Sequence, residues 1–225
     1  SGRSCRVSQL FADRVGPGLL VTVDGPNGSG KTSLAAEVAE RLRLRGHIVH
    51  NTAQPSPSLL GNVVRESERE VSGRALACLA AGDRHHQLKL EIEPALNRGE
   101  IVICDRYVES SLVLQRLDGV AIEYILAINE GIVRPDLRLR LFAEAETLRL
   151  RVEQRPRNPA RRFERLAEGP SRELDLYVEA DELLTRECGM PSLAFDTTRT
   201  RAAELGERVA QEIDQRRRWA TRLAS

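Results

Sequence analysis

Residues 25–32 read Gly-Pro-Asn-Gly-Ser-Gly-Lys-Thr and fit the pattern G-x-x-x-x-G-K-[ST]. An apolar run at 19–23 precedes this segment and a helical pattern follows it, so a strand, a loop and a helix are expected in that order. The glycines Gly25, Gly28 and Gly30 let the backbone curl until successive N–H groups point into one concavity, which a Cβ would crowd. A phosphate group bound there would lie at the N-terminus of a helix.

The loop also supplies side chains for a nucleotide and its metal ion. Lys31 is placed to reach the β- and γ-phosphates, and the hydroxyl of Thr32 to ligate Mg²⁺. Lys31 and Lys89 are the only lysines among 34 basic side chains, so a chain that otherwise uses arginine keeps a compact ammonium group here. We expect the nucleotide to be bound by the whole loop: Gly25, Pro26, Asn27, Gly28, Ser29, Gly30, Lys31, Thr32 and Ser33.

The composition, with 41% hydrophobic and 30% charged residues in a chain of 225, is typical of a soluble globular protein. The formal net charge of +1 gives no overall field for a nucleic acid polymer or an anionic membrane, so neither partner is expected. No apolar stretch approaches 18 residues, and the cysteines are too far apart for a zinc knuckle or a C-x-x-C pair. The expected location is the reducing cytoplasm. The cysteines are Cys5, Cys78, Cys104 and Cys188.

Short apolar runs alternate with longer helical patterns along the chain. The expected strands are 19–24, 47–52, 100–104, 137–143 and 192–196, and the expected helices are 30–45, 59–71, 73–97, 110–131, 145–154, 171–187 and 200–223. This alternation predicts an α/β fold with a five-stranded parallel sheet, helices on both faces and ligands at the carboxyl ends of the strands. Residues 1–17 are expected to be an N-terminal extension and residues 18–225 one domain.

Two further segments carry groups suited to phosphate chemistry. The third expected strand runs into Asp105-Arg106-Tyr107, which places a carboxylate and a guanidinium beside the loop, where Mg²⁺ and a transferring phosphate would be held. A surface ion pair at a strand end is the alternative reading of this triplet. The segment 155–165 is too basic and too rich in proline to belong to a core, and it is either a solvated loop or a basic lid.

The order of several motifs is similar to that of the thymidylate kinases, a family of P-loop nucleoside monophosphate kinases. The segment 99–115, with Asp105-Arg106-Tyr107, Ser110 and Gln115, resembles the family's D-R-Y-x-x-S-x-x-A-Y-Q. The other matches occur in the family's order between residues 19 and about 200, and only the ordered set is specific. They are Gly61-Asn62-Val63-Val64-Arg65, Asp83-Arg84-His85-His86, Pro94-Ala95-Leu96, Pro135-Asp136-Leu137 and Arg162-Phe163-Glu164.

The resemblance implies transfer of a phosphoryl group from ATP·Mg²⁺ to a nucleoside monophosphate, either dTMP or another or modified pyrimidine monophosphate. It implies that Arg65, Arg84 and Arg106 grip the acceptor phosphate, that Gln115 faces the base, and that Asp105 reaches the metal through water.

The resemblance also implies where the catalytic arginine lies. Family members with no arginine inside the phosphate loop carry basic residues in the lid, so the lid at about 155–165 is expected to supply it, through Arg157 or Arg161. Together with Lys31 and Arg106, these are the expected catalytic residues. An arginine that arrives on closure would stabilise charge in the transition state and exclude water.

Three departures from the family pattern affect the acceptor site. Asn27 replaces an acidic loop residue that contacts the sugar, and Ala53-Gln54 replace the arginine and glutamate of T-R-E-P. Ala80 stands where an aromatic side chain stacks on thymine. Because such stacking contributes about 1–3 kcal/mol per base, we expect relaxed base selection and poor use of dTMP.

Other interpretations remain open at this point. A kinase of a small non-nucleotide acceptor and a regulatory ATP-binding module without turnover both fit the loop. The resemblance also implies a homodimer through the helices at 59–97 and 110–131, although apolar faces there are equally explained as core that covers the sheet.

Overall fold

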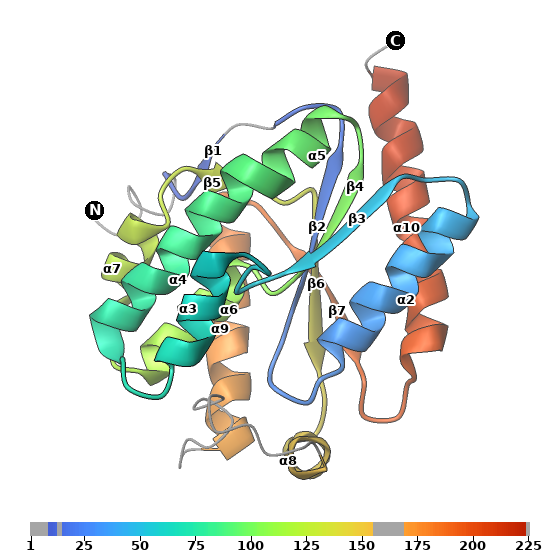
Figure 1. Cartoon of the computed structure of the whole chain (residues 1–225). Coiled ribbons are helices and arrows are strands. Elements are labelled where there is room, and N and C mark those ends of the chain that lie inside the picture. Colours follow the sequence, from blue (N-terminus) through green and yellow to red (C-terminus); the bar gives the residue numbers. More distant parts are fainter. Residues whose placement is uncertain (1–8, 13–14, 155–168, 224–225) are drawn as a thin grey trace.

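A five-stranded parallel sheet forms the centre of the molecule (Figure 1), in a computed structural model that describes residues 9–12, 15–154 and 169–223. The strand order is β3-β4-β2-β6-β7, and every neighbouring pair is parallel. The bounds are β2 Leu19–Asp24, β3 Val49–Ala53, β4 Ile101–Asp105, β6 Leu137–Phe142 and β7 Ser192–Asp196. The α/β class and the five-stranded parallel sheet predicted from the sequence are confirmed.

The two strands that carry the site are buried along their whole length. All six residues of β2 and all five of β4 are buried, as expected for parallel strands covered by helices on both faces. In their shared register Val23 lies opposite Asp105, so the carboxyl ends of β2 and β4 are side by side. The loop after β2 and the residues after β4 therefore meet at one edge of the sheet.

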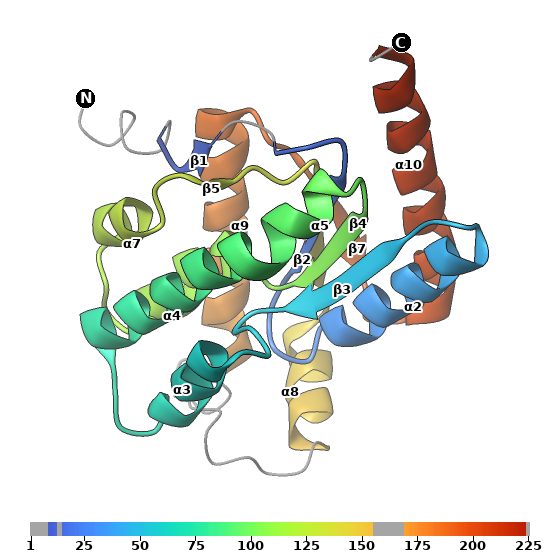
Figure 2. The same cartoon turned by 45° about the horizontal axis from the view of Figure 1, so that its top comes forward.

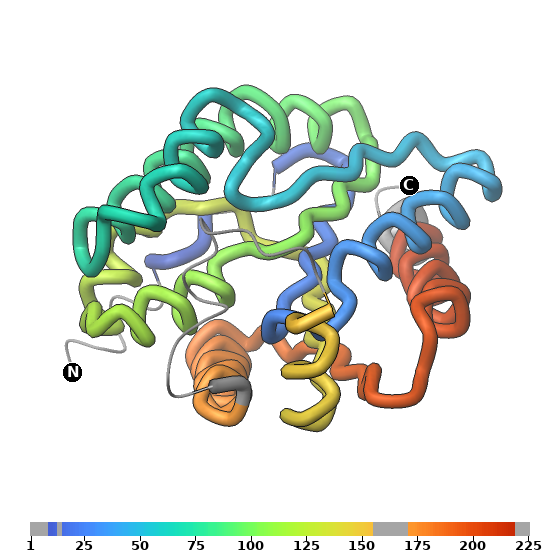
Figure 3. Tube along the Cα trace, turned by 60° about the horizontal axis from the view of Figure 1, so that its bottom comes forward, coloured from blue at the N-terminus to red at the C-terminus, as the bar shows by residue number. Residues whose placement is uncertain are grey.

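Helices cover the two faces of the sheet unequally. One face packs against α2 (Lys31–Leu44) and α10 (Ala202–Leu223), which lie beside each other in Figure 3. The opposite face packs against α4 (Gly73–Gln87), α6 (Val108–Leu117) and α9 (Gly169–Cys188). Each face has its own apolar core, one around Val21 and Val38 and the other around Leu20 and Leu112.

The long helix expected at 73–97 occurs with those bounds but changes its winding. Between α4 and α5 (Glu93–Asn97), residues Leu88–Ile92 form the π-helical turn η1. Such turns shift side chains around the helix axis and are frequent at functional sites. The remaining short helices are α3 (Leu59–Ser67), α7 (Ile122–Ile128) and α8 (Ala145–Glu153).

Two expectations differ from the structure. The single helix expected at 110–131 is wrong, because α6 ends at Leu117 and Gly119 takes a φ of 77° before α7 begins. A second, two-stranded sheet pairs β1 (Phe11–Ala12) with β5 (Ile132–Val133), and neither strand was expected. Leu10 is fully buried in the core, so this described part of the expected N-terminal extension packs against the domain.

Among the described residues, none of the helices combines the length and the apolar content that crossing a bilayer requires.

Candidate active site

The phosphate loop leaves the end of β2 and lies against α8 (Figure 2). At two positions of the loop only glycine fits, because φ is positive and a Cβ atom would clash with a neighbouring carbonyl oxygen. Gly25 has a φ of 146°, and a Cβ there would lie 2.3 Å from the carbonyl oxygen of Leu141. Gly28 has a φ of 84°, and its Cβ would lie 2.8 Å from the carbonyl oxygen of Leu148. The curled backbone predicted from the glycine spacing is present.

Lys31 begins α2 and points back into the loop. Its side chain is 6% exposed, and its Nζ donates a hydrogen bond to the carbonyl oxygen of Pro26 at 2.8 Å. Burial, together with the positive charge of Arg106, lowers the pKa of Lys31 to about 7. Burial therefore disfavours the charged form of Lys31. A bound phosphate would stabilise the ammonium group by adding negative charge next to it.

Thr32 and Asp105 come from different strand ends and form one contact. The hydroxyl of Thr32 donates to Oδ2 of Asp105 at 2.5 Å. The other carboxylate oxygen of Asp105, Oδ1, is buried without a hydrogen-bond partner. Mg²⁺ prefers oxygen ligands and keeps several of its waters, so a hydroxyl beside a carboxylate oxygen that still needs a partner fits this ion. Within the described ranges, no three or more His, Cys, Asp or Glu side chains gather into a metal site.

Arg106 has an unusual backbone and several side-chain contacts. Its φ of 72° makes it the one non-glycine residue with positive φ in the described part of the chain, a conformation that costs about 1 kcal/mol or more. Its guanidinium donates to Asn27 Oδ1 at 2.7 Å, to Ser110 Oγ at 3.2 Å and to Tyr177 OH at 3.4 Å. The side chain is thereby turned toward the phosphate loop.

Asp24, the last residue of β2, fixes the start of α6. Its Oδ1 accepts hydrogen bonds from the N–H of Tyr107 at 3.1 Å, the N–H of Ser110 at 3.0 Å and the hydroxyl of Ser110 at 2.6 Å. A carboxylate at a helix N-terminus is favourable because it satisfies N–H groups that have no partner inside the helix. Since Ser110 also contacts Arg106, Asp24 helps to hold the arginine in place.

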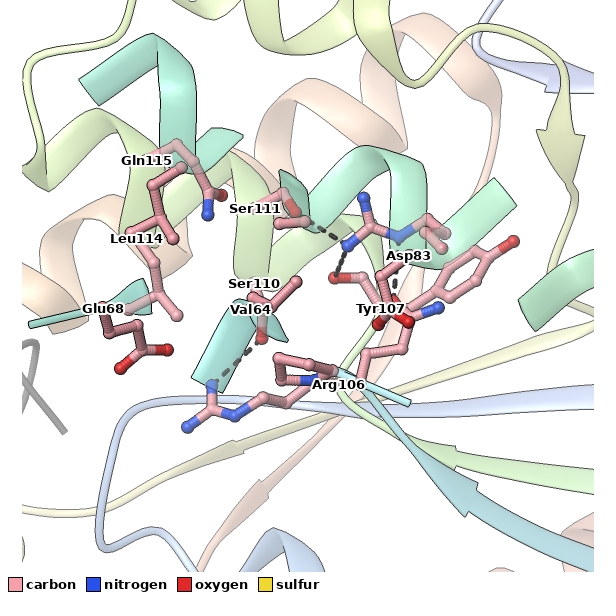
Figure 4. Close-up of a pocket in the computed structure, with 14 residues that line it drawn as sticks. Val64, Glu68, Asp83, Arg106, Tyr107, Ser110, Ser111, Leu114 and Gln115 are labelled. Atoms are coloured by element: carbon pink, nitrogen blue, oxygen red, sulfur yellow. Dashed lines mark hydrogen bonds between the residues drawn. The ribbon is translucent and has the colours of Figure 1, made fainter. Parts of the chain in front are cut away.

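A cavity opens next to Arg106 between α3, α4 and α6 (Figure 4). Its lining divides into a polar end and an apolar end. Arg84, Arg106, Ser110 and Ser111 form the polar end near the phosphate loop, and the carboxylate of Asp83 also lines the cavity. A few polar groups that converge beside apolar side chains are typical of a small-molecule site.

Arg84, on α4, is 3% exposed and has no carboxylate among its hydrogen-bond partners. Its guanidinium donates to Gln54 Oε1 at 2.8 Å and to Ser111 Oγ at 2.7 Å. It also contacts the amide oxygen of Asn129 and the carbonyl oxygen of Tyr107. Burial lowers its pKa, which reflects the cost of holding a cation among neutral groups.

The other end of the cavity contains the apolar side chains of Leu76, Ala80, Leu114 and Val64, with Gln115 and the carboxylate of Glu68 beside them (Figure 4). The Oε1 atom of Gln115 is buried and has no hydrogen-bond partner, so a ligand with an N–H group would satisfy it. Tyr107 is the only aromatic residue in this described lining, and it is 1% exposed with its hydroxyl bonded to Val133. Its ring is therefore not free to stack on a base in place of the aromatic side chain missing at Ala80.

The remaining site residues predicted from the sequence have different outcomes. Arg65 does not line the cavity, and its guanidinium donates to the carbonyl oxygens of Pro55 and Ser56 at 2.6 and 2.8 Å. Arg157, Arg161 and the lid at about 155–165 lie outside the described residues, so their roles stay predictions.

Several residues with clear positions at the site were missed. Arg151 on α8 contacts the carbonyl oxygen of Gly28 at 3.4 Å and that of Thr197 at 2.7 Å. Both line a second, wider hollow on the other side of the loop, next to Ser33. Arg151 could have been found from the sequence, because it lies one turn before the basic segment at 155–165. No sequence motif identified Thr197, because it lies near the loop only as a result of the order of the strands in the sheet.

The phosphate loop at the central strand, the Thr32–Asp105 contact and the arginine-lined cavity define a P-loop kinase. The family model described as thymidylate kinase matches residues 23–173. The chain therefore belongs to the thymidylate kinase family, a family of nucleoside monophosphate phosphotransferases.

Curated relatives agree with this assignment. The chain is 38% identical over 141 residues to a probable thymidylate kinase of Caldivirga maquilingensis, which covers 61% of this chain and 69% of that protein. It is 39% identical over 142 residues to a probable thymidylate kinase of Pyrobaculum calidifontis, which covers 62% of this chain and 72% of that protein.

Proposed function

We propose that this protein transfers the γ-phosphoryl group of ATP, in the presence of Mg²⁺, to the phosphate of a nucleoside monophosphate. The observation that carries the proposal is the pair of arginines in the cavity. Both Arg84 and Arg106 donate hydrogen bonds only to uncharged groups within the described chain. Two guanidinium groups held in this way form a site for an anion, and the phosphate loop lies next to them.

On the donor side, the loop N–H groups and Lys31 hold the β- and γ-phosphates. Thr32 and Asp105 would hold Mg²⁺, which when bound neutralises the charge that develops on the phosphate oxygens. The hollow lined by Ser33, Arg151 and Thr197 is open beside the loop and has room for the rest of the donor nucleotide. Arg157 or Arg161 remains our proposal for the arginine that completes the catalytic set.

On the acceptor side, Arg106 lies closest to the loop and Gln115 at the far end of the cavity. A monophosphate bound at Arg106 and Arg84 therefore directs its base toward Gln115 and Ala80. The side-chain amide of Gln115 favours a pyrimidine edge, because it can both donate and accept hydrogen bonds in the plane of the base. Since Ala80 offers no ring to stack on, we propose a pyrimidine monophosphate other than dTMP, or a modified one, as the preferred acceptor.

The proposal extends to assembly and location. A homodimer through the helices at 59–97 and 110–131 is supported by the exposed side chains of Leu59, Leu60 and Val63 on α3. Cys78 and Cys104 form no disulfide in the described part of the chain, which is consistent with the reducing cytoplasm that we propose as the location.

The experiment is a release assay for ADP with ATP·Mg²⁺ and a panel of pyrimidine and purine monophosphates, each paired with its unphosphorylated nucleoside. The proposal requires turnover with at least one pyrimidine monophosphate and none with the nucleosides. Turnover with a sugar or another non-nucleotide acceptor alone would support the rival kinase. Binding of ATP with no turnover on any acceptor would support the regulatory module.

A further inference from the structure

One side-chain amide of the phosphate loop lies between an arginine and a carboxylate. Arg106 donates to Asn27 Oδ1 at 2.7 Å. The backbone N–H and the side-chain Nδ2 of Asn27 donate to Glu173 Oε1 at 3.1 and 3.5 Å. Glu173 is 6% exposed and lies on α9, 146 positions further along the chain. A carboxylate from a distant helix therefore lies beside a loop whose own residues, 25–32, include no acid.

Hydrogen-bonding chemistry fixes the direction of this amide. A guanidinium group only donates, so the oxygen of Asn27 must face Arg106. An ionised carboxylate only accepts, so the nitrogen of Asn27 must face Glu173. Glu173 thereby turns the amide oxygen of Asn27 toward Arg106.

A second side chain of α9 contacts the same arginine. Tyr177 follows Glu173 by four residues, about one helical turn, so both side chains lie on the same face of α9. The hydroxyl of Tyr177 is 3.4 Å from Arg106 Nη1 and 3.0 Å from Ser110 Oγ. Arg106 depends on such contacts, because its φ of 72° is unfavourable for a residue with a Cβ. Helix α9 therefore supports Arg106 directly through Tyr177 and indirectly through Asn27.

The charge of Glu173 also acts on the cations near the loop. Burial lowers the pKa of Arg106, but Tyr177 and nearby carboxylates, Glu173 among them, outweigh burial and raise that pKa above its ordinary value. Burial and the charge of Arg106 lower the pKa of Lys31. The charges of Asp105 and Glu173 act on Lys31 in the opposite direction. Glu173 is thus part of the electrostatics of the loop.

A second carboxylate at position 27 would not fit beside Glu173. Because Nδ2 of Asn27 is 3.5 Å from Glu173 Oε1, an aspartate there would bring two carboxylates together. Two carboxylates that share a site do not both ionise readily, and the pKa of one is raised. The family pattern has its acidic residue at position 27, whereas this chain has an amide there and a carboxylate next to it. Positions 27 and 173 therefore form a pair that carries one negative charge.

We propose that Glu173 is a positioning residue: it supplies from α9 the negative charge that the loop lacks at Asn27, and through Asn27 it holds Arg106 in place for the acceptor phosphate. The inference rests on the proposed function, because Arg106 acts on the acceptor of that reaction. If one charge serves both positions, exchanging the acid and the amide should preserve activity.

The test is this exchange. Four proteins are compared: the wild type, Asn27→Asp, Glu173→Gln and the double variant with both substitutions. The double variant keeps the net charge, and its amide at position 173 can donate to the carboxylate at position 27 and accept the backbone N–H. Glu182→Gln, exposed on the same helix, is the matched control for the loss of a carboxylate from α9.

Two properties of each protein are measured. The first is turnover, as kcat and KM for ATP with the best acceptor of the monophosphate panel. The second is the affinity for dTMP, dUMP and dCMP, by calorimetric titration without ATP. The melting temperature of each variant serves as the control for folding.

We expect Glu173→Gln to lower kcat about tenfold or more, because Arg106 is then no longer held in the geometry that transfer requires. KM for ATP should stay within about threefold, because Lys31 and the loop glycines are unchanged. Asn27→Asp should lower kcat to a similar extent, and the double variant should recover to within about threefold of the wild type. Monophosphate affinities should follow the same order, and Glu182→Gln should behave like the wild type.

A double variant no more active than the single variants would show that the charge cannot be moved between the two positions, which overturns the inference. A Glu173→Gln variant with a lower melting temperature and an unchanged kcat also overturns it, because Glu173 would then only stabilise the fold. If Glu173→Gln fails to fold, the double variant must fold and be about tenfold or more as active as Asn27→Asp. If the four proteins bind monophosphates in the expected order and the wild type transfers no phosphoryl group, the proposed function alone is contradicted.

Discussion

The hydroxyl of Thr32, at the start of α2, lies 2.5 Å from the carboxylate of Asp105, at the end of β4. The two residues are 73 positions apart in the chain, and adjacent parallel strands bring them together. The second carboxylate oxygen of Asp105 is buried without a partner. This pair is the Mg²⁺ site that we propose for the reaction.

Asp105→Asn should therefore raise the Mg²⁺ concentration needed for half-maximal activity at least tenfold and lower kcat. The amide keeps the size of the carboxylate and one acceptor oxygen, but it loses the negative charge that attracts the ion. The measurement is a Mg²⁺ titration of initial rate, with EDTA-treated wild type as the zero point. An unchanged Mg²⁺ dependence would remove Asp105 from the metal site.

Lys31→Ala should abolish phosphoryl transfer and leave the fold intact. In our proposal the ammonium group acts as a point charge on the β- and γ-phosphates, and its hydrogen bond to Pro26 lies within the loop itself. Circular dichroism and the melting temperature serve as the control for folding. Retention of more than about a tenth of wild-type kcat, equivalent to a loss of roughly 1.4 kcal/mol or less, would refute the assignment.

Ala80→Phe should raise kcat/KM for dTMP by about 5- to 150-fold, because stacking on a base contributes about 1–3 kcal/mol. Ala80 lines the cavity, and the aromatic residue already in its described lining, Tyr107, is buried. Ala80→Leu is the matched control, since it fills space without offering an aromatic face. An equal gain from both substitutions would show that filled volume, and not stacking, was missing.

Glu109 and Arg138 form a buried ion pair behind the site, with a nitrogen–oxygen distance of 2.6 Å. Burial raises the pKa of Glu109 to about 7 in spite of the arginine. The folded state thus holds this proton more tightly than the unfolded chain does. The contribution of Glu109 to stability is therefore greatest below its ordinary pKa of 4.5 and is lost as the pH rises to about 7.

The free energy of unfolding should accordingly fall between pH 5 and pH 7.5 by up to about 3 kcal/mol from this group, and the fall should be absent in Glu109→Gln. Urea denaturation of both proteins across this range measures the difference. Glu204→Gln, on α10, is the matched control and should keep the wild-type dependence. If Glu109→Gln shows the same pH dependence of stability as the wild type, then the titration of Glu109 does not cause the fall between pH 5 and pH 7.5.

The fold was predictable where the apolar or helical sequence pattern is continuous. It was less predictable where a single residue changes the direction of the backbone. The run at 19–24 matches β2 because a buried parallel strand is apolar along its length. The run at 192–196 also matches β7, although β7 is an edge strand in which only Phe195 is buried. The break at Gly119 was missed because the residues on both sides keep a helical pattern. Strands β1 and β5 contain two residues each, too few for any periodicity.

The residues of the candidate site also divide into those that the sequence predicts and those that it does not. Lys31 and Thr32 belong to one local motif, and Asp105 and Arg106 could be placed because strand ends meet at one edge of a parallel sheet. Gln54, Glu173 and Tyr177 were not predicted as site residues. Their contacts depend on how α4 and α9 pack against the loop, and no spacing along the chain encodes that packing.

The most direct measurement of the central claim follows the phosphoryl group itself. ATP labelled at the γ-phosphate is incubated with the enzyme, Mg²⁺ and the best acceptor of the monophosphate panel, and the products are separated and identified. We predict that the label appears in the β-position of a nucleoside diphosphate, with one ADP formed per diphosphate. Label recovered only as inorganic phosphate, or retained in ATP with every monophosphate, would contradict the claim.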